Sequence, residues 1–427
     1  MQSFDWQDLT ITPEKRGARE FLKVSYPIRY GCYGEIRAGG HVFQFNRNGE
    51  IKFIEGRSLG GFDHEGWLKR TLGNDWVFYS AGDYGGVYDL YGEYYVPSLP
   101  YPSNALVGRR LLEEEALGRA LEGWRRLREE IRGSLPGRFG KEVVDFLGSV
   151  AAGDDQRLRD RADRLHRLIG GRLSVLPPDS RHVDYEVIPL VVVQGCAYHC
   201  GFCRVKSDQG LSVRTLREID DEVEGLRAFL GPDLSNYNAL FLGNHDALQA
   251  GVEVLTHVAE RAYHAFEFDR SYMKGAYLFL FGSVGSFLGA KDSLFETLNQ
   301  LPYFTYVNIG MESVDPETLT VLRKPVAAEK VREAFTRMVE INPRHEKIEV
   351  SANFVLGEGL SERHFHSLVE MVSRNPRTPQ GKGCLYLSPL VEGPLEEVRR
   401  RRALIRQFYT VKKASFLPVY LYLIQRL

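Results

Sequence analysis

Residues 191–206 read VVVQGCAYHCGFCRVK, and this stretch decides the fold. A β-branched apolar run over 187–193 is typical of a buried strand. The loop after it carries Cys196, Cys200 and Cys203 at the spacing C-x3-C-x2-C. Three thiolates at this spacing cannot share one face of a helix, so they predict an irregular loop folded around a metal centre. Soft sulfur ligands select iron–sulfur clusters, zinc or copper(I).

The number of cysteines in this loop is informative because it is three rather than four. A closed structural zinc site and an electron-transfer [4Fe–4S] cluster each take four protein ligands. Three cysteines leave one iron of a cubane open, and an open position on a metal is where a substrate or cofactor binds. The alternative is a zinc loop with His199 or a remote residue as fourth ligand. His199 directly precedes Cys200, which makes it hard for both side chains to join one tetrahedral ion, so the cluster is favoured.

The cysteine spacing, with the aromatic Phe202 just before the last cysteine, resembles the motif of the radical S-adenosylmethionine (SAM) superfamily. The resemblance implies a [4Fe–4S] cluster on Cys196, Cys200 and Cys203, with the amino and carboxylate groups of SAM chelating the fourth iron. It also implies that one electron, from a donor such as flavodoxin or ferredoxin, cleaves SAM to a 5′-deoxyadenosyl radical that abstracts hydrogen from a substrate. The cofactor supplies the difficult step, and the protein positions it and excludes water.

The composition is that of an ordinary soluble globular protein, with 427 residues, 43% hydrophobic and 26% charged. A net charge of −1 gives no bulk attraction to nucleic acid or anionic lipid. The start MQSFDWQDLT has no signal-peptide pattern, and no apolar run is long enough to span a membrane. Five cysteines do not make a disulfide framework, so we expect a reducing, cytoplasmic compartment.

Outside the loop only Cys32 and Cys384 remain, so a second four-cysteine cluster cannot be built. This argues against radical SAM subfamilies with auxiliary clusters and against methylthiotransferases, which need three further N-terminal cysteines. Each spare thiol is expected to be a small buried hydrophobe. In a less favoured interpretation, Cys384 belongs to the substrate site.

Alternating strand and helix patterns over 184–391 predict a parallel sheet with covering helices. The expected strands cover 187–193, 239–242, 276–282, 303–309, 348–356 and 384–390. The expected helices between them cover 216–230, 252–266, 292–301, 328–341 and 362–373. Six such units match the α/β partial (β/α)6 barrel that the resemblance implies. Residues 392–427 are expected to pack on this barrel as an extension, ending in a strand or a final helix.

The first half of the chain predicts two further parts. Residues 109–183 form a helical connector with helices over 109–133 and 154–170, and 1–108 form a β-rich aromatic domain. The segment 41–56, HVFQFNRNGEIKFIEG, alternates around Asn-Gly and predicts a hairpin. Tyrosines are concentrated at positions 79, 84, 88, 91, 94, 95 and 101. They could line a ligand pocket, although half-buried strands also favour tyrosine, which is the preferred interpretation. We expect this domain to meet the barrel mouth, with tyrosines covering the cluster side.

Side chains at the carboxyl ends of the barrel strands are the candidate cofactor contacts, because parallel barrels place their sites there. Gly243, Asn244 and Asp246 end the second strand, and the resemblance brings this segment to the amino group of SAM. An ordinary turn with an aspartate cap is the alternative. The third strand ends at Ser283, which either contacts a ligand or belongs to a turn.

The fourth strand resembles the group that contains oxygen-independent coproporphyrinogen oxidases and methylthiotransferases. Its segment 307–325 reads VNIGMESVDPETLTVLRKP. The resemblance places a SAM-binding carboxylate at Glu312, with Ser313 beside it. Glu312 as a purely structural ion-pair partner is the alternative. Lys324 is interpreted as a structural charge at a helix end.

The fifth strand, 348–362, reads IEVSANFVLGEGLSE and resembles the same group. Glu358 stands where that group often has proline, which leaves the adenine contacts undefined. Ser351 and Asn353 alternate on the barrel-lining face. Buried polar side chains need partners, and a nucleoside would supply them.

We therefore expect a radical SAM enzyme whose substrate and catalytic residues the sequence does not identify. Coproporphyrinogen oxidase is disfavoured, because Arg204-Val205 follow the motif where its cluster loop continues with another cysteine. A small metabolite is preferred over a peptide or RNA, since phosphate contacts dominate RNA affinity and the charge is near zero. A different class of alternative is a non-catalytic iron–sulfur or zinc module, such as a redox sensor.

Overall fold

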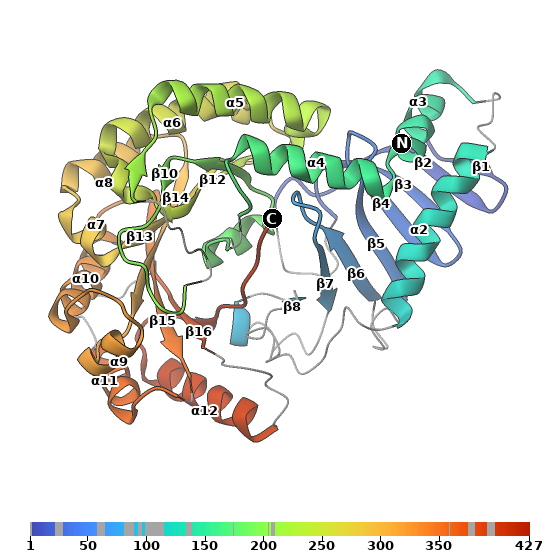
Figure 1. Cartoon of the computed structure of the whole chain (residues 1–427). Coiled ribbons are helices and arrows are strands. Elements are labelled where there is room, and N and C mark those ends of the chain that lie inside the picture. Colours follow the sequence, from blue (N-terminus) through green and yellow to red (C-terminus); the bar gives the residue numbers. More distant parts are fainter. Residues whose placement is uncertain are drawn as a thin grey trace.

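The computed structural model holds two sheets joined by helices (Figure 1). It describes residues 2–21, 29–57, 65–80, 89–92, 96–98, 115–133, 139–173, 175–203, 205, 210–357, 359–374, 381–390 and 398–427. The first sheet is antiparallel and lies in the N-terminal region. The second is parallel and is surrounded by helices on its outer face.

Eight strands follow one another in chain order in the first sheet. They are β1 (Phe4–Trp6), β2 (Leu9–Arg16), β3 (Cys32–Ala38), β4 (His41–Phe45), β5 (Ile51–Arg57), β6 (Glu65–Arg70), β7 (Trp76–Ser80) and β8 (Val96–Ser98). The expected hairpin is confirmed, because β4 pairs antiparallel with β5 and Gly49 takes the left-handed φ of +76° that the turn requires.

Three connector helices are present in the described residues, where two were expected. They are α2 (Glu115–Gly133), α3 (Lys141–Ala152) and α4 (Asp155–Leu168). Helices α2 and α3 share one apolar core with the first sheet, in which Phe43, Trp124 and Leu147 are fully buried. The overlooked helix α3 buries Val143, Leu147 and Val150, and this helical spacing was present in the sequence.

The parallel sheet contains the six expected strands and a seventh. They are β9 (Ile188–Val191), β12 (Ala239–Asp246), β13 (Tyr277–Ser283), β14 (Phe304–Glu312), β15 (Ile348–Leu356), β16 (Leu385–Pro389) and β17 (Val419–Leu421). The spatial order is β17-β16-β15-β14-β13-β12-β9, with every pair parallel. The C-terminal run therefore adds a strand to the barrel sheet, in addition to packing on it.

Helices between these strands cover the outer face of the sheet (Figure 1). They are α5 (Leu216–Leu230), α6 (Gly251–Ala265), α7 (Val284–Gly289), α8 (Asp292–Gln300), α9 (Pro316–Val321), α10 (Ala328–Ile341), α11 (Glu362–Ser373) and α12 (Val398–Ala414). Local sequence sets their starts: Thr215 and Glu218 form a capping box on α5, and Ser361 caps α11. No helix within the described residues is long and apolar enough to cross a membrane.

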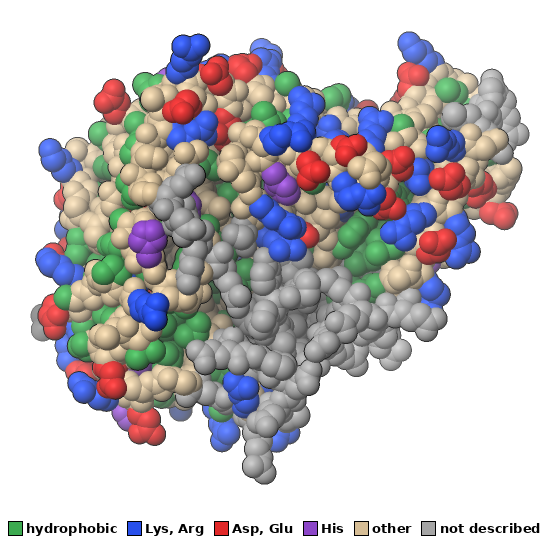
Figure 2. Space-filling model, viewed as in Figure 1, with side chains coloured by type: hydrophobic (Ala, Val, Ile, Leu, Met, Phe, Trp, Pro, Cys, Tyr) green, Lys and Arg blue, Asp and Glu red, His purple; other side chains and the backbone are tan. Residues whose placement is uncertain are grey.

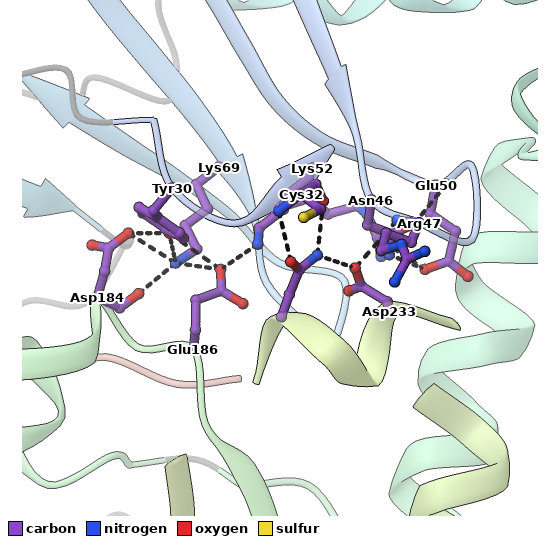
Figure 3. Close-up of polar contacts among 12 residues, drawn as sticks. Tyr30, Cys32, Asn46, Arg47, Glu50, Lys52, Lys69, Asp184, Glu186 and Asp233 are labelled. Carbon is purple, nitrogen blue, oxygen red and sulfur yellow. Dashed lines mark hydrogen bonds and ion pairs between the residues drawn. The ribbon is translucent and has the colours of Figure 1, made fainter. Parts of the chain in front are cut away.

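The first sheet docks at the amino end of the barrel strands, which Figure 3 shows in close-up. Lys69 forms ion pairs with Asp184 at 3.2 Å and Glu186 at 2.8 Å, just before β9. The backbone N–H of Cys32 donates to Asn236 Oδ1 at 2.7 Å, just before β12. The cysteine loop follows the carboxyl end of β9, so it lies at the opposite end of the barrel.

The expectation that the N-terminal domain meets the barrel mouth is therefore wrong for the sheet that the structure describes. The physical reason is charge pairing: buried lysines of the sheet face acidic residues that precede the barrel strands. Tyrosines 84, 88, 94, 95 and 101 and the side chain of Tyr79 lie outside the described residues. Tyr91 is buried in the barrel core.

The acid dependence of stability at this interface rests on Asp233. Burial raises the pKa of Asp233 to about 6 from 3.8, although Lys52 and hydrogen bonds from Arg47 and Asn236 oppose the shift. The folded state then holds a proton that the unfolded chain has already released. We expect the contribution of Asp233 to the free energy of unfolding to fall by roughly 2–3 kcal/mol as pH rises from about 4 to about 6. In D233N this contribution should vanish.

Chemical denaturation of wild type and D233N across this pH range measures the effect. The exposed Asp221 supplies a control, since D221N should keep the wild-type pH profile. An identical pH slope in D233N and the wild type would contradict the assignment.

Candidate functional site

A cavity of about 290 Å³ opens at the carboxyl ends of the barrel strands. The cysteine loop forms one wall, where the short strands β10 (Val193–Gln194) and β11 (Ser212–Val213) pair and close its base. Strand ends from β12 to β16 and residues after β17 form the remainder. The polar and cysteine residues that line it are Cys196, Tyr198, Cys200, Cys203, Asn244, His245, Asp246, Ser283, Glu312, Lys324, Asn353, Ser388 and Tyr422.

All three loop cysteines face this one cavity. Backbone N–H groups donate to two of the sulfurs, Tyr198 N to Cys196 Sγ and Val205 N to Cys203 Sγ, each at 3.4 Å. The middle of the loop is anchored where Gly201 N donates to the carbonyl of Leu322 at 2.9 Å. Backbone donors to sulfur are typical of cysteine loops that hold iron–sulfur clusters.

Burial raises the pKa of two of the loop thiols. It raises the pKa of Cys200 to about 11, against the opposing charge of Lys324, and it also raises the pKa of Cys203. Binding of a metal centre would displace these protons, because cysteine ligates as the thiolate.

No three Cys, His, Asp or Glu side chains in the described part of the chain are grouped as ligands of a single ion. His199, the zinc alternative, is exposed and does not line the cavity.

A buried ion pair lies next to the cysteines. Lys324 Nζ is 3.0 Å from Glu312 Oε1, and both side chains are at least nine-tenths buried. The ammonium also lies 5.9 Å from the centroid of the Tyr198 ring. Burial lowers the pKa of Lys324, but Glu312 and Cys200 outweigh this effect and raise it, so the lysine stays charged. The cavity therefore has the Lys324 ammonium and its carboxyl partner Glu312 beside the three cysteines.

The chain reverses at Glu312, which ends β14 with a left-handed φ of +64°. This turn sends the next residue away from the cavity. Ser313 is fully buried and its Oγ bonds His364 Nδ1 at 2.8 Å and the backbone N–H of Asp315 at 3.0 Å. Ser313 therefore serves the turn and α11, and its predicted cofactor contact is not supported by this placement.

Strand ends β12 and β13 supply hydrogen-bonding groups. Asp246 accepts from Ser286 Oγ at 2.6 Å, while Ser283 and Ser286 form the capping box of α7. Asn244 Oδ1 is buried without a hydrogen-bond partner in the described structure. His245, which stands between Asn244 and Asp246 in the sequence, also lines the cavity, and burial lowers its pKa.

Six of the nine predicted cofactor residues line the cavity: Phe202, Asn244, Asp246, Ser283, Glu312 and Asn353. Gly243, Ser313 and Ser351 do not. A Cβ on Gly243 would lie 2.2 Å from the Phe241 ring, so packing explains this glycine. Ser351 shares a strand face with Asn353 but lies one pleat deeper in the barrel, where Asp179 and Asn308 satisfy its hydroxyl.

The sequence also placed His245 at the end of the second strand, and it lines the cavity. Sequence reasoning missed Tyr198, Lys324 and Tyr422 as lining residues. Tyr198 stands inside the cysteine loop, so its position was an available signal. Lys324 was interpreted as a helix-end charge, and only the reversal at Glu312 brings it to the cavity. Tyr422 follows β17, which the six-strand expectation did not include.

Comparison with known proteins gives consistent matches. Residues 190–372 match the family described as the radical SAM superfamily. The chain is 24% identical over 313 residues to ribosomal protein uS12 methylthiotransferase RimO of Gloeobacter violaceus, covering 66% of this chain and 67% of that protein. It is 21% identical over 287 residues to RimO of a Synechococcus species, covering 61% of this chain and 58% of that protein.

Among solved structures, the cobalamin-dependent SAM radical enzyme OxsB matches with a TM-score of 0.35 and 12% identity. That match covers 54% of this chain and 31% of the other. Methylornithine synthase PylB matches with a TM-score of 0.33 and 12% identity, covering 75% of this chain and 83% of the other.

Proposed function

We propose that the protein is a SAM-dependent radical enzyme, because residues 190–372 match the radical SAM superfamily. In this proposal Cys196, Cys200 and Cys203 hold the [4Fe–4S] cluster that the superfamily uses. The observation that carries it is that the three cysteines share one cavity with a buried, charged Glu312–Lys324 pair. Three sulfur ligands leave one iron open, which suits a cluster that binds SAM.

The bound cluster would supply the electron that cleaves SAM to methionine and a 5′-deoxyadenosyl radical. The protein's own groups would bind and orient SAM. Lys324 offers a positive charge to a carboxylate or to the thiolate ligands, and Glu312 offers a negative charge to the ammonium or sulfonium. The buried oxygens of Asn244 and Asn353 have no partner among the described groups, and the donors of SAM would provide one. Phe202 contributes an apolar wall.

For the substrate we propose a small metabolite. Methylthio transfer does not fit these 427 residues, since only two cysteines lie outside the loop and that class of enzyme needs three further cysteines. Cys32 lies in the first sheet at the amino end of the barrel, and Cys384 is buried in the barrel core beside Tyr386. They cannot join in a second cluster. The similarity to RimO, whose name specifies a ribosomal protein, favours a protein substrate as the second candidate.

Anaerobic reconstitution of the full chain tests the proposal. We expect about four irons and four sulfides per chain, and a change in the cluster's electron paramagnetic resonance spectrum when SAM is added. With flavodoxin and its reductase, or with dithionite, 5′-deoxyadenosine should accumulate. Stoichiometric zinc in place of iron would refute the enzyme. A loaded, SAM-binding cluster that yields no 5′-deoxyadenosine would refute it in favour of a binding module.

A further inference from the structure

Beneath the cavity, a series of side-chain hydrogen bonds connects its wall to a buried carboxylate. Asn353 donates from Nδ2 to Asn308 Oδ1 at 2.5 Å, and Asn308 donates from Nδ2 to Ser351 Oγ at 2.8 Å. Ser351 donates from Oγ to Asp179 Oδ2 at 2.6 Å. Asp179 is 1% exposed and belongs to a 3-10 helix of the connector, Pro178–Val183, outside the part that matches the family.

The carboxylate sets the direction of every bond in this series. An ionised carboxylate only accepts hydrogen bonds, so the Ser351 hydroxyl has to donate to it. Asn308 must then present its amide nitrogen to Ser351, which turns its oxygen toward Asn353. Asn353 in turn donates one amide hydrogen to Asn308. Its oxygen, which accepts from no group of the series, is left at the cavity end together with the second amide hydrogen.

The surroundings of Asp179 bear on its charge. Burial raises the pKa of Asp179, while hydrogen bonds from Ser351 and Tyr386, the nearby Arg181 and a weaker hydrogen bond from Asn308 act against the shift. Tyr386 OH donates to Asp179 Oδ1 at 2.8 Å and itself accepts from Arg181 Nε at 3.1 Å. A cation thus polarises one of the donors, which favours the carboxylate form. Both carboxylate oxygens are occupied by hydroxyl donors.

The free end of the series points to a ligand. Asn353 is 9% exposed and lines the cavity, yet its Oδ1 is buried and has no partner in the described structure. Buried amide oxygens are normally paired, so this position calls for a ligand with an N–H or O–H group. The nucleoside of SAM carries neutral donors of this kind, namely the ribose hydroxyls and the adenine amino group.

We propose that Asp179 is a positioning residue that holds Asn353 as the acceptor for a neutral donor of the SAM nucleoside. The inference rests on the proposed function, since SAM is the ligand. The connector would thereby complete a site whose other polar groups come from the barrel. An asparagine at position 179 both donates and accepts, so it would leave the direction of the series undetermined.

The test measures discrimination between nucleosides and uses the reconstituted full chain at mildly alkaline pH. Adenosine, 2′,3′-dideoxyadenosine and purine riboside, which lacks the amino group, compete with SAM for the site. The wild type should bind one of the two analogues about tenfold more weakly than adenosine. Weaker binding of 2′,3′-dideoxyadenosine identifies a ribose hydroxyl as the donor, and weaker binding of purine riboside identifies the amino group. In D179N and S351A this ratio should fall to about one, and the D179N/S351A double variant should show no further loss.

Y386F is the matched control. It removes the hydroxyl donor on the other oxygen of Asp179 but leaves the Ser351 bond and the series to Asn353 in place, so at the mildly alkaline pH of the test, which favours the carboxylate form, its discrimination should match the wild type. Equal weakening of all three nucleosides in D179N and S351A would reduce Asp179 to a packing role and overturn the inference. S351A deletes a single oxygen, so it reports even where D179N does not fold. Absence of SAM binding to the wild type would instead contradict the proposed function.

Discussion

The C200A variant is expected to lose the iron–sulfur cluster, with iron content falling from about four to below one per chain and SAM cleavage below about 1% of wild type. Cys200 is the least exposed of the three loop cysteines, and it lies beside the charge of Lys324. Two thiolates would leave a second iron of the cubane without a protein ligand. Iron and sulfide analysis after reconstitution and chromatographic assay of 5′-deoxyadenosine measure the two losses.

C32A supplies the control for this experiment. Cys32 is buried at the start of β3, at the amino end of the barrel, and takes no part in the cavity. Its variant should load iron as the wild type does. A C200A protein that retains full iron content and cleaves SAM would show that the three-cysteine assignment is wrong.

The K324M variant is expected to lose about 100-fold in SAM affinity and about 3–5 kcal/mol of stability. Glu312 would then be a buried carboxylate without its cation, only 8% exposed. The E312Q/K324M double variant removes both charges and should recover most of the stability while binding SAM no better. Chemical denaturation of the apo chain and calorimetric titration of SAM into reconstituted protein separate the two effects.

The exposed pair of Lys330 and Glu333 on α10 provides a comparison within the same molecule. Its atoms lie 2.7 Å apart with both side chains more than half exposed, so K330M should change stability by less than about 0.5 kcal/mol. If K324M and K330M had equal effects, the buried pair would have no special role. If the double variant regained SAM affinity along with stability, the pair would support folding alone.

The barrel could be predicted from the sequence because its helices and strands have clear local patterns of apolar residues. The helix α5 has apolar residues at helical spacing, and β15 is an apolar strand interrupted by Glu349, Ser351 and Asn353. Both were predicted with the observed bounds. The cysteine loop follows directly from a buried strand. Strand ends of a parallel sheet meet at one edge, which is why most predicted cofactor residues line the same cavity.

Depth along a strand and contacts across the chain were not predictable in this way. Period-two alternation assigns Ser351 and Asn353 to one face, but it does not tell which of them reaches the cavity and which is covered. Helix α9 separates Glu312 from Lys324 in the sequence. The lysine reaches the carboxylate because the backbone reverses at Glu312, and no residue type in this segment predicts that reversal. The docking of Lys69 on Glu186 joins residues more than a hundred positions apart, for which a single sequence has no signal.

The short length of β17 limits how far the edge of the parallel sheet can pair with strands of other molecules. This three-residue strand is the outermost member of the parallel sheet and pairs with the five-residue β16. A long bare edge would offer a template for adding strands from other molecules, whereas so short a border presents few unpaired amide groups. Removal of residues 419–421 would leave the five-residue β16 as the edge strand of this sheet.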